Sequence, residues 1–301
     1  MKLRLQLHLH TVESKGTRIP IESVITPKNV VDIAKKKNID VVAITDHNTT
    51  TAYSKIENYA RSKGILIING IEVNTTDGHL IGLGIDEGLE KRLNKNMGAI
   101  EVNDLIRSCG GEVYIPHPFD IREEGLGVKI GEIKGIVEVF NSMNIFGFED
   151  KFADIVASRM GLPKAVGGDV HTIGMIDTGI TVIESELDLC SILKTLRRGR
   201  TSFENCNYMT LREMKEWALE RTTSSYEFIM NNIRHGWISD KWYMNIANLR
   251  LIKILEKKVL GYGIKNKKSK MWDLITYLSF ITANIYGQFS KKEFYGFLST
   301  L

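Results

Sequence analysis

The sequence predicts an α/β protein, a barrel of the β/α type followed by a C-terminal α-helical appendage. Short apolar runs alternate with helical patterns over the first 205 residues, which favours a mostly parallel sheet joined by right-handed helical crossovers. Histidine and acidic residues recur where these runs end, at the position where such barrels carry their functional groups. From Asn207 onward the strand-like runs disappear. We therefore divide the chain into a barrel, residues 1–205, and a basic, aromatic-rich helical domain, residues 206–301.

The elements of the barrel follow from local patterns. A strand-like run spans Lys2–Leu9. After a loop, Pro27 begins a helix, since proline is tolerated in a first turn. The short apolar run Val41–Thr45 is typical of a strand buried on both faces, and Thr75–Gly78 predicts a hairpin turn. The remaining predicted strands are 65–71, 80–84, 112–115, 135–140 and 181–183, and the remaining helices include 50–63, 149–160 and 187–198.

The appendage is predicted to be helical throughout, with helices at about 210–234, 239–260, 270–286 and 290–299. The segment Met271–Phe289 carries one charge, Asp273, and is flanked by lysines. Three interpretations stay open for it. It packs on the barrel or on a partner chain, it forms a nucleic-acid platform, or it lies in a membrane surface.

Charge and cysteine content indicate the compartment and the partners. The net charge is +4, but residues 207–301 carry 15 Lys and Arg against 8 Asp and Glu, whereas residues 1–206 carry 25 against 28. An acidic barrel suits cations, and a basic appendage suits an anionic partner. Three scattered cysteines form no disulfide framework, and charges interrupt the first apolar run, so no secretory signal is expected. We expect a reduced, cytoplasmic protein.

Six of the seven histidines lie at the ends of strand-like runs. His8 and His10 are two residues apart, so in a strand both rings leave from the same face. Two imidazoles on one face are half of a metal chelate, and they are followed by His47, His79, His117 and His171 at later strand ends. His235 lies outside these runs and is expected to be a surface or helix-terminal histidine.

The segments HLHT, ITDHN, GIEV with GHLIGLG, IPHPF and GGDVHT resemble, in order and spacing, the motifs of the PHP family (the polymerase and histidinol phosphatase superfamily). The resemblance covers about residues 1–205. It implies a distorted (β/α)7, TIM-like barrel with two or three divalent metals at the C-terminal ends of its strands. Family members hydrolyse phosphate esters, namely histidinol phosphate, nucleotides or nucleic-acid ends.

The resemblance also implies the ligands. His8, His10 and Asp169 would hold the first metal, Glu72 would bridge the first and second, His79 and His117 would complete the second, and His47 and His171 would bind the third. Imidazoles and carboxylates suit Zn²⁺, Mn²⁺ or Fe²⁺. A metal-bound hydroxide at such a di- or trinuclear site could attack phosphorus. Asp169, Glu72 and His171 are the expected catalytic residues.

The sequence departs from the family pattern at two positions. Gln6 stands where many members have Asp, in a supporting role. Lys15 stands where many phosphatase members have a third-metal aspartate, and a protonated lysine cannot bind a cation. Three outcomes stay open: Glu13 or Glu22 substitutes for the aspartate, the third metal is weak or absent, or the Lys15 ammonium meets the phosphate.

Several other residues receive predictions of lower weight. Asp46 either orients a ligand or caps the following helix. Arg122 is either a phosphate clamp or a solvated loop residue. Glu138 and Asn141 end a strand at the same mouth but receive no ligand role. Gly167-Gly168 is expected to permit close backbone passage before Asp169. Cys190, among apolar residues of a helix, is expected in the core.

We therefore expect a metal-dependent hydrolase, a phosphatase or nuclease, acting on a phosphorylated small molecule, a nucleotide or a nucleic-acid end. The alternative is a catalytically impaired PHP barrel that binds nucleic acid or protein through its helical tail. The sequence predicts no oligomeric state.

Overall fold

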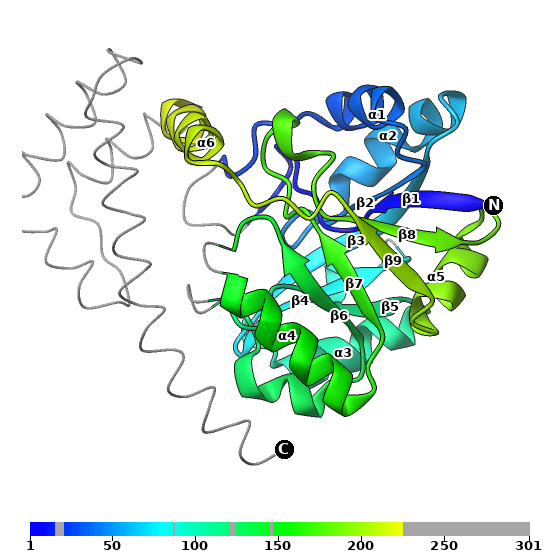
Figure 1. Ribbon diagram of the computed structural model, residues 1–301, viewed down its shortest axis with the longest axis vertical. Coiled ribbons are helices and arrows are strands. Elements are labelled where there is room, and N and C mark those ends of the chain that lie inside the picture. The colour runs from blue at the N-terminus through cyan, green and yellow to red at the C-terminus, as the bar shows by residue number, and fades with distance from the viewer. Residues whose placement is uncertain (16–20, 87, 121–123, 145–146, 225–301) are drawn as a thin grey trace, which may run out of the picture.

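The computed structural model describes residues 1–15, 21–86, 88–120, 124–144 and 147–224. Nine strands form one sheet in the order β7-β6-β5-β4-β3-β2-β1-β8-β9, which curls into a nearly closed barrel (Figure 1). The predicted α/β barrel is thus confirmed. The strands are β1 (Lys2–Gln6), β2 (Val41–Ile44), β3 (Leu66–Thr75), β4 (Gly78–Leu83), β5 (Glu112–Ile115), β6 (Ile136–Asn141), β7 (Lys164–Gly167), β8 (Ile180–Glu184) and β9 (Thr201–Glu204).

The sheet is mixed, and the expectation of a mostly parallel sheet was wrong. Four of the described strand pairs are parallel and four are antiparallel. All four antiparallel pairs involve either β4 or β8. These two reversed strands therefore account for the departure of the sheet from an all-parallel barrel. β4 is reversed because the predicted turn after Thr75 joins it to β3 as a hairpin. Since β4 runs backwards, its first residues lie at the mouth where the parallel strands end.

The barrel closes where β1 and β7 run on past their ends. The amide of His10 donates to Val170 O at 3.0 Å, and the amide of Val170 donates to His8 O at 3.1 Å. Lower in the wall, the Thr181 hydroxyl of β8 bonds both backbone groups of Val166 in β7 at 2.9 Å. These contacts fix the strand ends that carry the histidines and Asp169.

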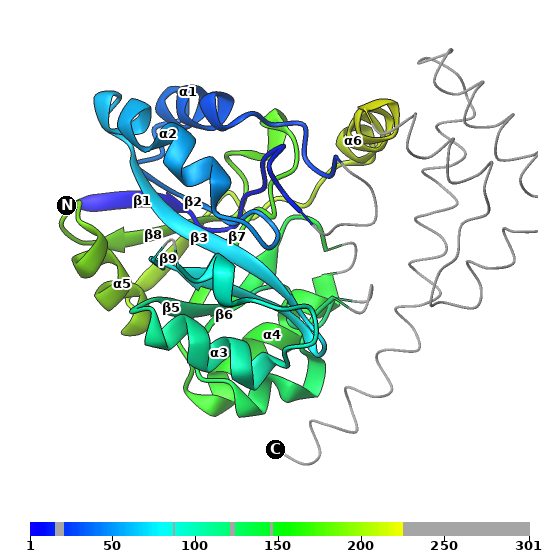
Figure 2. The same ribbon diagram turned by 180° about the vertical axis from the view of Figure 1, so that it is seen from behind.

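The helices cover the outside of the sheet. Those described are α1 (Pro27–Lys36), α2 (Thr51–Ser62), α3 (Ala99–Ser108), α4 (Gly147–Met160), α5 (Leu189–Arg197) and α6 (Leu211–Ser224), with short 3₁₀ turns η1 (Glu90–Arg92), η2 (Gly127–Glu132) and η3 (Ile173–Met175). α1 and α2 lie together on one side, and α3 and α4 lie on another (Figures 1 and 2). As predicted, Pro27 begins α1, and the Thr26 hydroxyl caps it by accepting from the Asn29 amide.

The barrel interior is apolar at the end opposite to the histidines. Leu3 and Leu5 of β1 pack there with residues of most other strands and with Ile192, Leu193 and Leu196 of α5. α5 lies near the N-terminal end of β1, whereas α6 lies at the far side of the barrel (Figure 2). One end of the barrel is therefore closed by hydrophobic packing, and the other is left for polar groups.

The appendage is described only as far as α6. The predicted helices beyond residue 224, including Met271–Phe289, and His235 lie outside the described residues. Among the helices that the structure describes, none has both the length and the apolar character needed to cross a bilayer.

Candidate metal centre

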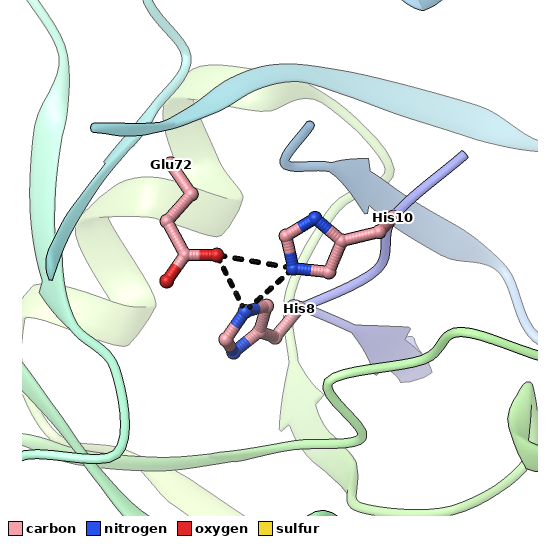
Figure 3. A group of neighbouring side chains, drawn as sticks. All are labelled: His8, His10 and Glu72. Carbon is pink, nitrogen blue, oxygen red and sulfur yellow. Dashed lines mark hydrogen bonds and ion pairs between the residues drawn. The ribbon is translucent and has the colours of Figure 1, made fainter. Parts of the chain in front are cut away.

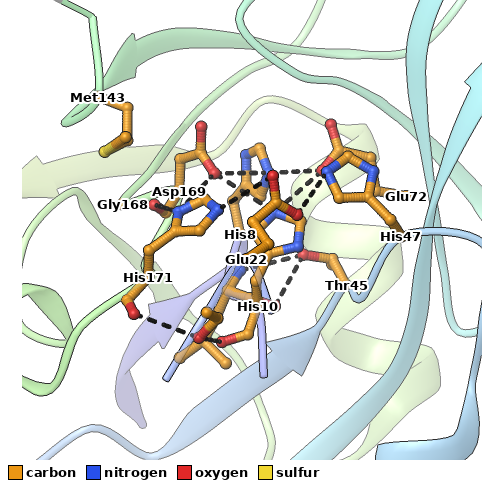
Figure 4. Close-up of polar contacts among 12 residues, drawn as sticks. His8, His10, Glu22, Thr45, His47, Glu72, Met143, Gly168, Asp169 and His171 are labelled. Atoms are coloured by element: carbon orange, nitrogen blue, oxygen red, sulfur yellow. Dashed lines mark hydrogen bonds and ion pairs between the residues drawn. The ribbon is translucent and has the colours of Figure 1, made fainter. Parts of the chain in front are cut away.

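Eight side chains from six strands and the loops after them meet at one mouth of the barrel. Figure 4 shows His8, His10, His47, Glu72, Asp169 and His171 there, together with Glu22. Each belongs to at least one group of three whose ligand atoms lie within 4.8 Å of one another. Eight of the residues expected to bind metal are brought together in this way: His8, His10, His47, Glu72, His79, His117, Asp169 and His171. We call this set, together with Glu22, the metal centre.

The innermost group consists of His8, His10 and Glu72 (Figure 3). Their Nε2 and Oε2 atoms form a triangle, with His8 Nε2 at 3.1 Å and His10 Nε2 at 3.0 Å from Glu72 Oε2, and 3.2 Å between the two nitrogens. Asp169 Oδ1 closes the group at 3.5 Å from His8 and 3.3 Å from His10. The strand geometry that directs both rings to one face makes this convergence possible.

Glu72 lies between two groups of histidines. Its Oε2 faces His8 and His10, whereas its Oε1 lies 2.9 Å from His79 Nδ1 and 3.1 Å from His117 Nε2. Glu72 is fully buried in the middle of β3, and His79 comes from the start of the reversed strand β4. A carboxylate with one oxygen toward each group has the disposition of a bridging ligand.

Two of these residues hold unusual backbone conformations. His117 has φ +27° and Asp169 has φ +47°, a region that residues other than glycine rarely adopt and that is concentrated at functional sites. Glu138 Oε2 accepts from the His117 amide at 2.7 Å. Gln6 braces the approach to Asp169, since its side chain accepts from Gly168 N at 3.0 Å and donates to Thr178 O at 2.7 Å.

Close passage of the chain before Asp169 requires glycine, as expected. A Cβ on Gly167 would collide with Glu138 Oε1 and lie 2.7 Å from His8 Cβ, and one on Gly168 would lie 2.8 Å from the Gln6 amide nitrogen. Neither contact leaves room for a side chain.

Neighbouring acceptors fix the orientation of three rings. The Nδ1 atoms of His8, His47 and His171 lie 3.0, 2.7 and 2.7 Å from Glu138 Oε1, Asn74 Oδ1 and the backbone oxygen of Asp169. Each ring then donates through Nδ1 and presents Nε2 to the metal centre as a potential ligand.

Glu138 is the supporting residue whose role sequence reasoning missed. Besides His8 and the His117 amide, it accepts from the Tyr114 hydroxyl at 2.8 Å and from Asn141 Nδ2 at 2.8 Å. It is buried, so all its bonds are to protein groups that surround the metal centre. The sequence signal for this role was an acidic residue in an otherwise apolar strand that ends at the mouth of the barrel.

The outer group contains His47, His171 and Glu22. Glu22 Oε2 lies 3.3 Å from His47 Nε2, and Glu22 Oε1 lies 3.9 Å from His171 Nε2. The structure does not bring the other two candidates here. The Glu13 carboxylate pairs with Lys55 at 2.6 Å, and the Lys15 ammonium pairs with Glu90 at 3.0 Å on the exposed side of the loop.

Asp46 supports the loop after β1 rather than contacting His47. Its carboxylate accepts from the Thr11 amide and hydroxyl at 2.5 and 2.7 Å and from the Ser14 hydroxyl at 3.0 Å. Ser14 Oγ in turn lies 3.4 Å from His10 Nδ1. Asp46 therefore reaches the metal centre through Ser14. Arg122 lies outside the described residues.

The electrostatics of the metal centre favour cations. Burial raises the pKa of Glu72 and Asp169, but the surrounding imidazoles outweigh it and hold both pKa values well below their ordinary range. Burial lowers the pKa of His10, yet Asp169 and Glu72 outweigh it and raise that pKa to about 10. For His47, burial prevails and lowers the pKa to about 4. Ionised carboxylates are thus balanced by ring protons, in positions where divalent cations would replace them.

The donor set fits divalent transition metals. It consists of imidazole nitrogens and carboxylate oxygens, as Zn²⁺, Mn²⁺ and Fe²⁺ prefer. Glu22 Oε2 is buried and has no hydrogen-bond partner among the described residues, although buried polar atoms are normally satisfied. A cation between Glu22 and His47 would satisfy it.

Comparisons with known proteins identify similar sequences and a similar fold. The model of the family described as PHP domain matches residues 6–260. An uncharacterized protein of Methanocaldococcus jannaschii is 34% identical over 156 residues, which cover 50% of this chain and 89% of that protein. Among solved structures, a two-domain Bacteroides vulgatus protein containing a predicted PHP-like metal-dependent phosphoesterase has a TM-score of 0.56 at 17% identity, covering 72% of this chain and 69% of that one. This likeness supports the fold.

Several relatives have names that state an activity. A 5'-3' exoribonuclease of Haemophilus influenzae is 27% identical over 132 residues, covering 40% of this chain and 44% of the enzyme. A 3',5'-nucleoside bisphosphate phosphatase of Chromobacterium violaceum is 34% identical over 86 residues, covering 27% of this chain and 28% of the enzyme. The chain therefore matches less than half of either enzyme.

Proposed function

We propose that this chain, which belongs to the PHP domain family, is a metal-dependent phosphoesterase whose substrate is a nucleotide or a nucleic-acid end. The observation that carries the proposal is Glu72, with one carboxylate oxygen toward His8 and His10 and the other toward His79 and His117. A shared carboxylate of this kind is how two cations are held close enough to act on one phosphate.

The proposed ligand assignment follows the three groups. His8, His10 and Asp169 would hold one cation, His79 and His117 a second, and Glu72 would bridge the two. Glu22 with His47 and His171 would hold a third, with Glu22 in place of the aspartate that Lys15 replaces. Mn²⁺, Zn²⁺ or Fe²⁺ would supply Lewis acidity for the phosphoryl oxygens and lower the pKa of an attacking water.

The protein's own groups would orient the reaction. The bond from His8 Nδ1 to Glu138 fixes which nitrogen of the ring faces the centre, and Asn141 Nδ2 lies 3.4 Å from Asp169 Oδ2, which limits rotation of that carboxylate. His171 Nε2, whose Nδ1 is held by the Asp169 backbone, would bind the outer cation or present a proton to the leaving oxygen. Burial of these side chains strengthens their electrostatic interactions.

Two observations support a nucleotide or nucleic-acid substrate. Relatives are named for a 5'-3' exoribonuclease, a nucleoside bisphosphate phosphatase and a cyclic phosphate diphosphodiesterase, whose substrates all contain phosphate on ribose or a nucleoside. Residues 207–301 are strongly basic, which suits an anionic polymer. We keep residues 206–301 as a proposed separate domain.

The test is a substrate screen with added Mn²⁺, run beside quantification of bound metal. Substrates would include a generic phosphomonoester, nucleoside 3',5'-bisphosphates and 5'-phosphorylated oligonucleotides. Asp169→Ala should lower activity by about 10³-fold, because a cation contributes several kcal/mol to transition-state stabilisation. Asp177→Asn is the control, since Asp177 pairs with Arg4 away from the metal centre.

Activity that Asp169→Ala leaves unchanged would contradict the proposal. A wild-type chain that binds its metals but hydrolyses none of these substrates would instead favour the alternative, an impaired barrel that serves as a binding module.

A further inference from the structure

The Trp217 side chain of helix α6 reaches the outer side of the metal centre. Its indole Nε1 donates to the backbone oxygen of Glu22 at 2.9 Å, across 195 positions of sequence. Its ring also packs against the His171 ring in an edge-to-face arrangement, with 5.2 Å between centroids and 62° between planes. Glu22 and His171 both belong to the outer group, so Trp217 contacts two of its three members.

Trp217 is itself firmly placed. The Arg221 guanidinium, one turn further along α6, lies over its ring at 5.0 Å from the centroid. The segment before α6 is tied to the barrel, because the Met209 amide donates to Ser142 O at 2.8 Å and the Tyr208 hydroxyl donates to Asp150 at 2.6 Å. The contacts with His171 and Arg221 together restrain the position of the indole.

Glu22, in contrast, lies in a stretch without helix or strand, four residues before the cap of α1. The next residue, Ser23, is anchored by its hydroxyl, which contacts His10 O at 2.8 Å and His171 O at 3.2 Å. The bond from Trp217 restrains Glu22 itself. That bond holds the backbone from which the Glu22 carboxylate extends to His47 and His171.

We propose that Trp217 is a positioning residue that holds Glu22 as a ligand of the outer cation, so that the helix following the barrel sets the occupancy of this site. The proposal rests on the proposed function for the existence of the outer cation. The coupling is reciprocal, since whatever α6 contributes to cation binding, the cation contributes to docking of α6.

The test is a titration of metal-free protein with Mn²⁺ alone, by calorimetry and by equilibrium dialysis with elemental analysis. Trp217→Phe keeps a ring against His171 but removes the donor to Glu22. It should weaken the third equivalent of Mn²⁺ by about 10-fold, as loss of a ligand's supporting bond does, and leave the first two unchanged. Glu22→Gln should remove the third equivalent, and adding Trp217→Phe to Glu22→Gln should change nothing further.

Tyr208→Phe is the matched control, because it removes another bond that ties this segment to the barrel without touching Glu22. If it weakens the third equivalent as much as Trp217→Phe does, the assignment to Trp217 is overturned. If the Trp217→Phe chain does not fold, tryptophan fluorescence of the wild-type and Glu22→Gln chains provides a second test. Filling the outer site should change tryptophan emission in the wild-type chain but not in Glu22→Gln, and equal emission changes in both would also overturn the proposal.

The two proposals fail differently. A wild-type chain that binds no Mn²⁺ contradicts the proposed function. A wild-type chain that binds only two ions, or a Trp217→Phe chain that binds the third as tightly as wild type, contradicts the role of Trp217 and leaves the phosphoesterase proposal standing.

Discussion

At the scale of single residues, the carboxylate of Glu138 holds several groups around the metal centre in place at once. It bonds His8 Nδ1, the His117 amide and the Tyr114 hydroxyl. The first two belong to residues that we assign to different cations. One buried side chain thus fixes ring orientation on one side and a strained backbone on the other, which makes Glu138 a sensitive position.

Glu138→Gln should therefore weaken the binding of the two inner cations by about 10–100-fold, since an amide offers His8 and His117 one acceptor oxygen in place of two. Titration of metal-free protein with Zn²⁺ measures the effect. Glu112→Gln is the control, because Glu112 is also buried on a neighbouring strand but pairs with Arg197. Equal weakening in both variants would show that the effect is one of general stability.

Gly167 is the second sensitive residue. Gly167→Ala should destabilise the fold by about 1–3 kcal/mol, as overpacking does, and reduce metal binding, because the new methyl group would displace Glu138 and His8 together. Gly131→Ala is the control, since a Cβ there meets nothing within 4 Å. Denaturant unfolding of both variants measures the difference, and equal stability of the two would refute the argument.

Among the elements, α4 and the segment after β9 are joined by a buried acid, Asp150. Its carboxylate accepts from the Asn141 amide at 3.1 Å, from the Asn144 side chain at 2.7 Å and from the Tyr208 hydroxyl. Burial nevertheless prevails over these bonds and raises the pKa of Asp150 to about 6. The three donors favour the ionised carboxylate, but burial outweighs them, so the folded state is most favourable when Asp150 is protonated.

The pH dependence follows from that sign. An aspartate with an unfolded pKa near 3.9 and a folded pKa near 6 contributes stability that is present below about pH 4 and is lost as pH rises through 6. The loss is on the order of 3 kcal/mol. Asp150→Asn should flatten the stability profile between pH 4 and 7, whereas Asp154→Asn, on an exposed position of the same helix, should not. Urea unfolding at several pH values tests this, and parallel wild-type and Asp150→Asn profiles would contradict it.

Helix α5 shows why the sequence-based placement of one residue was wrong. Cys190 was expected in the core, but it is exposed. The face of α5 that enters the barrel is formed by Ile192, Leu193 and Leu196, and Cys190 lies on another side of the helix. Apolar neighbours in sequence did not determine which face was buried; the angle at which α5 meets the barrel end did.

At the scale of the whole molecule, one end of the barrel is hydrophobic and the other concentrates charge. The apolar end holds the strands together through Leu3, Leu5 and α5. At the mouth, ionised Glu72 and Asp169 lie buried among imidazoles. Bringing these groups together opposes folding unless cations or protons balance them, so bound metal should stabilise the entire fold.

Metal removal should accordingly lower the melting temperature. A ligand at 100 times its dissociation constant contributes about 2.7 kcal/mol per site, which corresponds to a rise of several degrees for a chain of this size. Thermal unfolding of chelator-treated protein, with and without Mn²⁺, measures the effect. Asp169→Asn should show a smaller rise than wild type, and an equal rise would place the stabilising ions elsewhere.

The sequence by itself determined the local elements and the chemical character of the mouth. Strand-like runs, the Pro27 helix start, the turn after Thr75 and the glycines before Asp169 depend on backbone propensities and near neighbours, which a sequence displays directly. The histidines at the strand ends followed from the same patterns, and the family motifs extended them to a ligand set.

Only the tertiary structure decided how distant segments meet. It reversed β8, turned the two oxygens of Glu72 toward different histidines, and set Trp217 against Glu22. It also brought the carboxylate of Glu22, rather than the side chain of Glu13 or Lys15, to the His47 ring. These outcomes depend on packing and on contacts between residues up to 195 positions apart, and the energies of such contacts are not encoded in any local pattern.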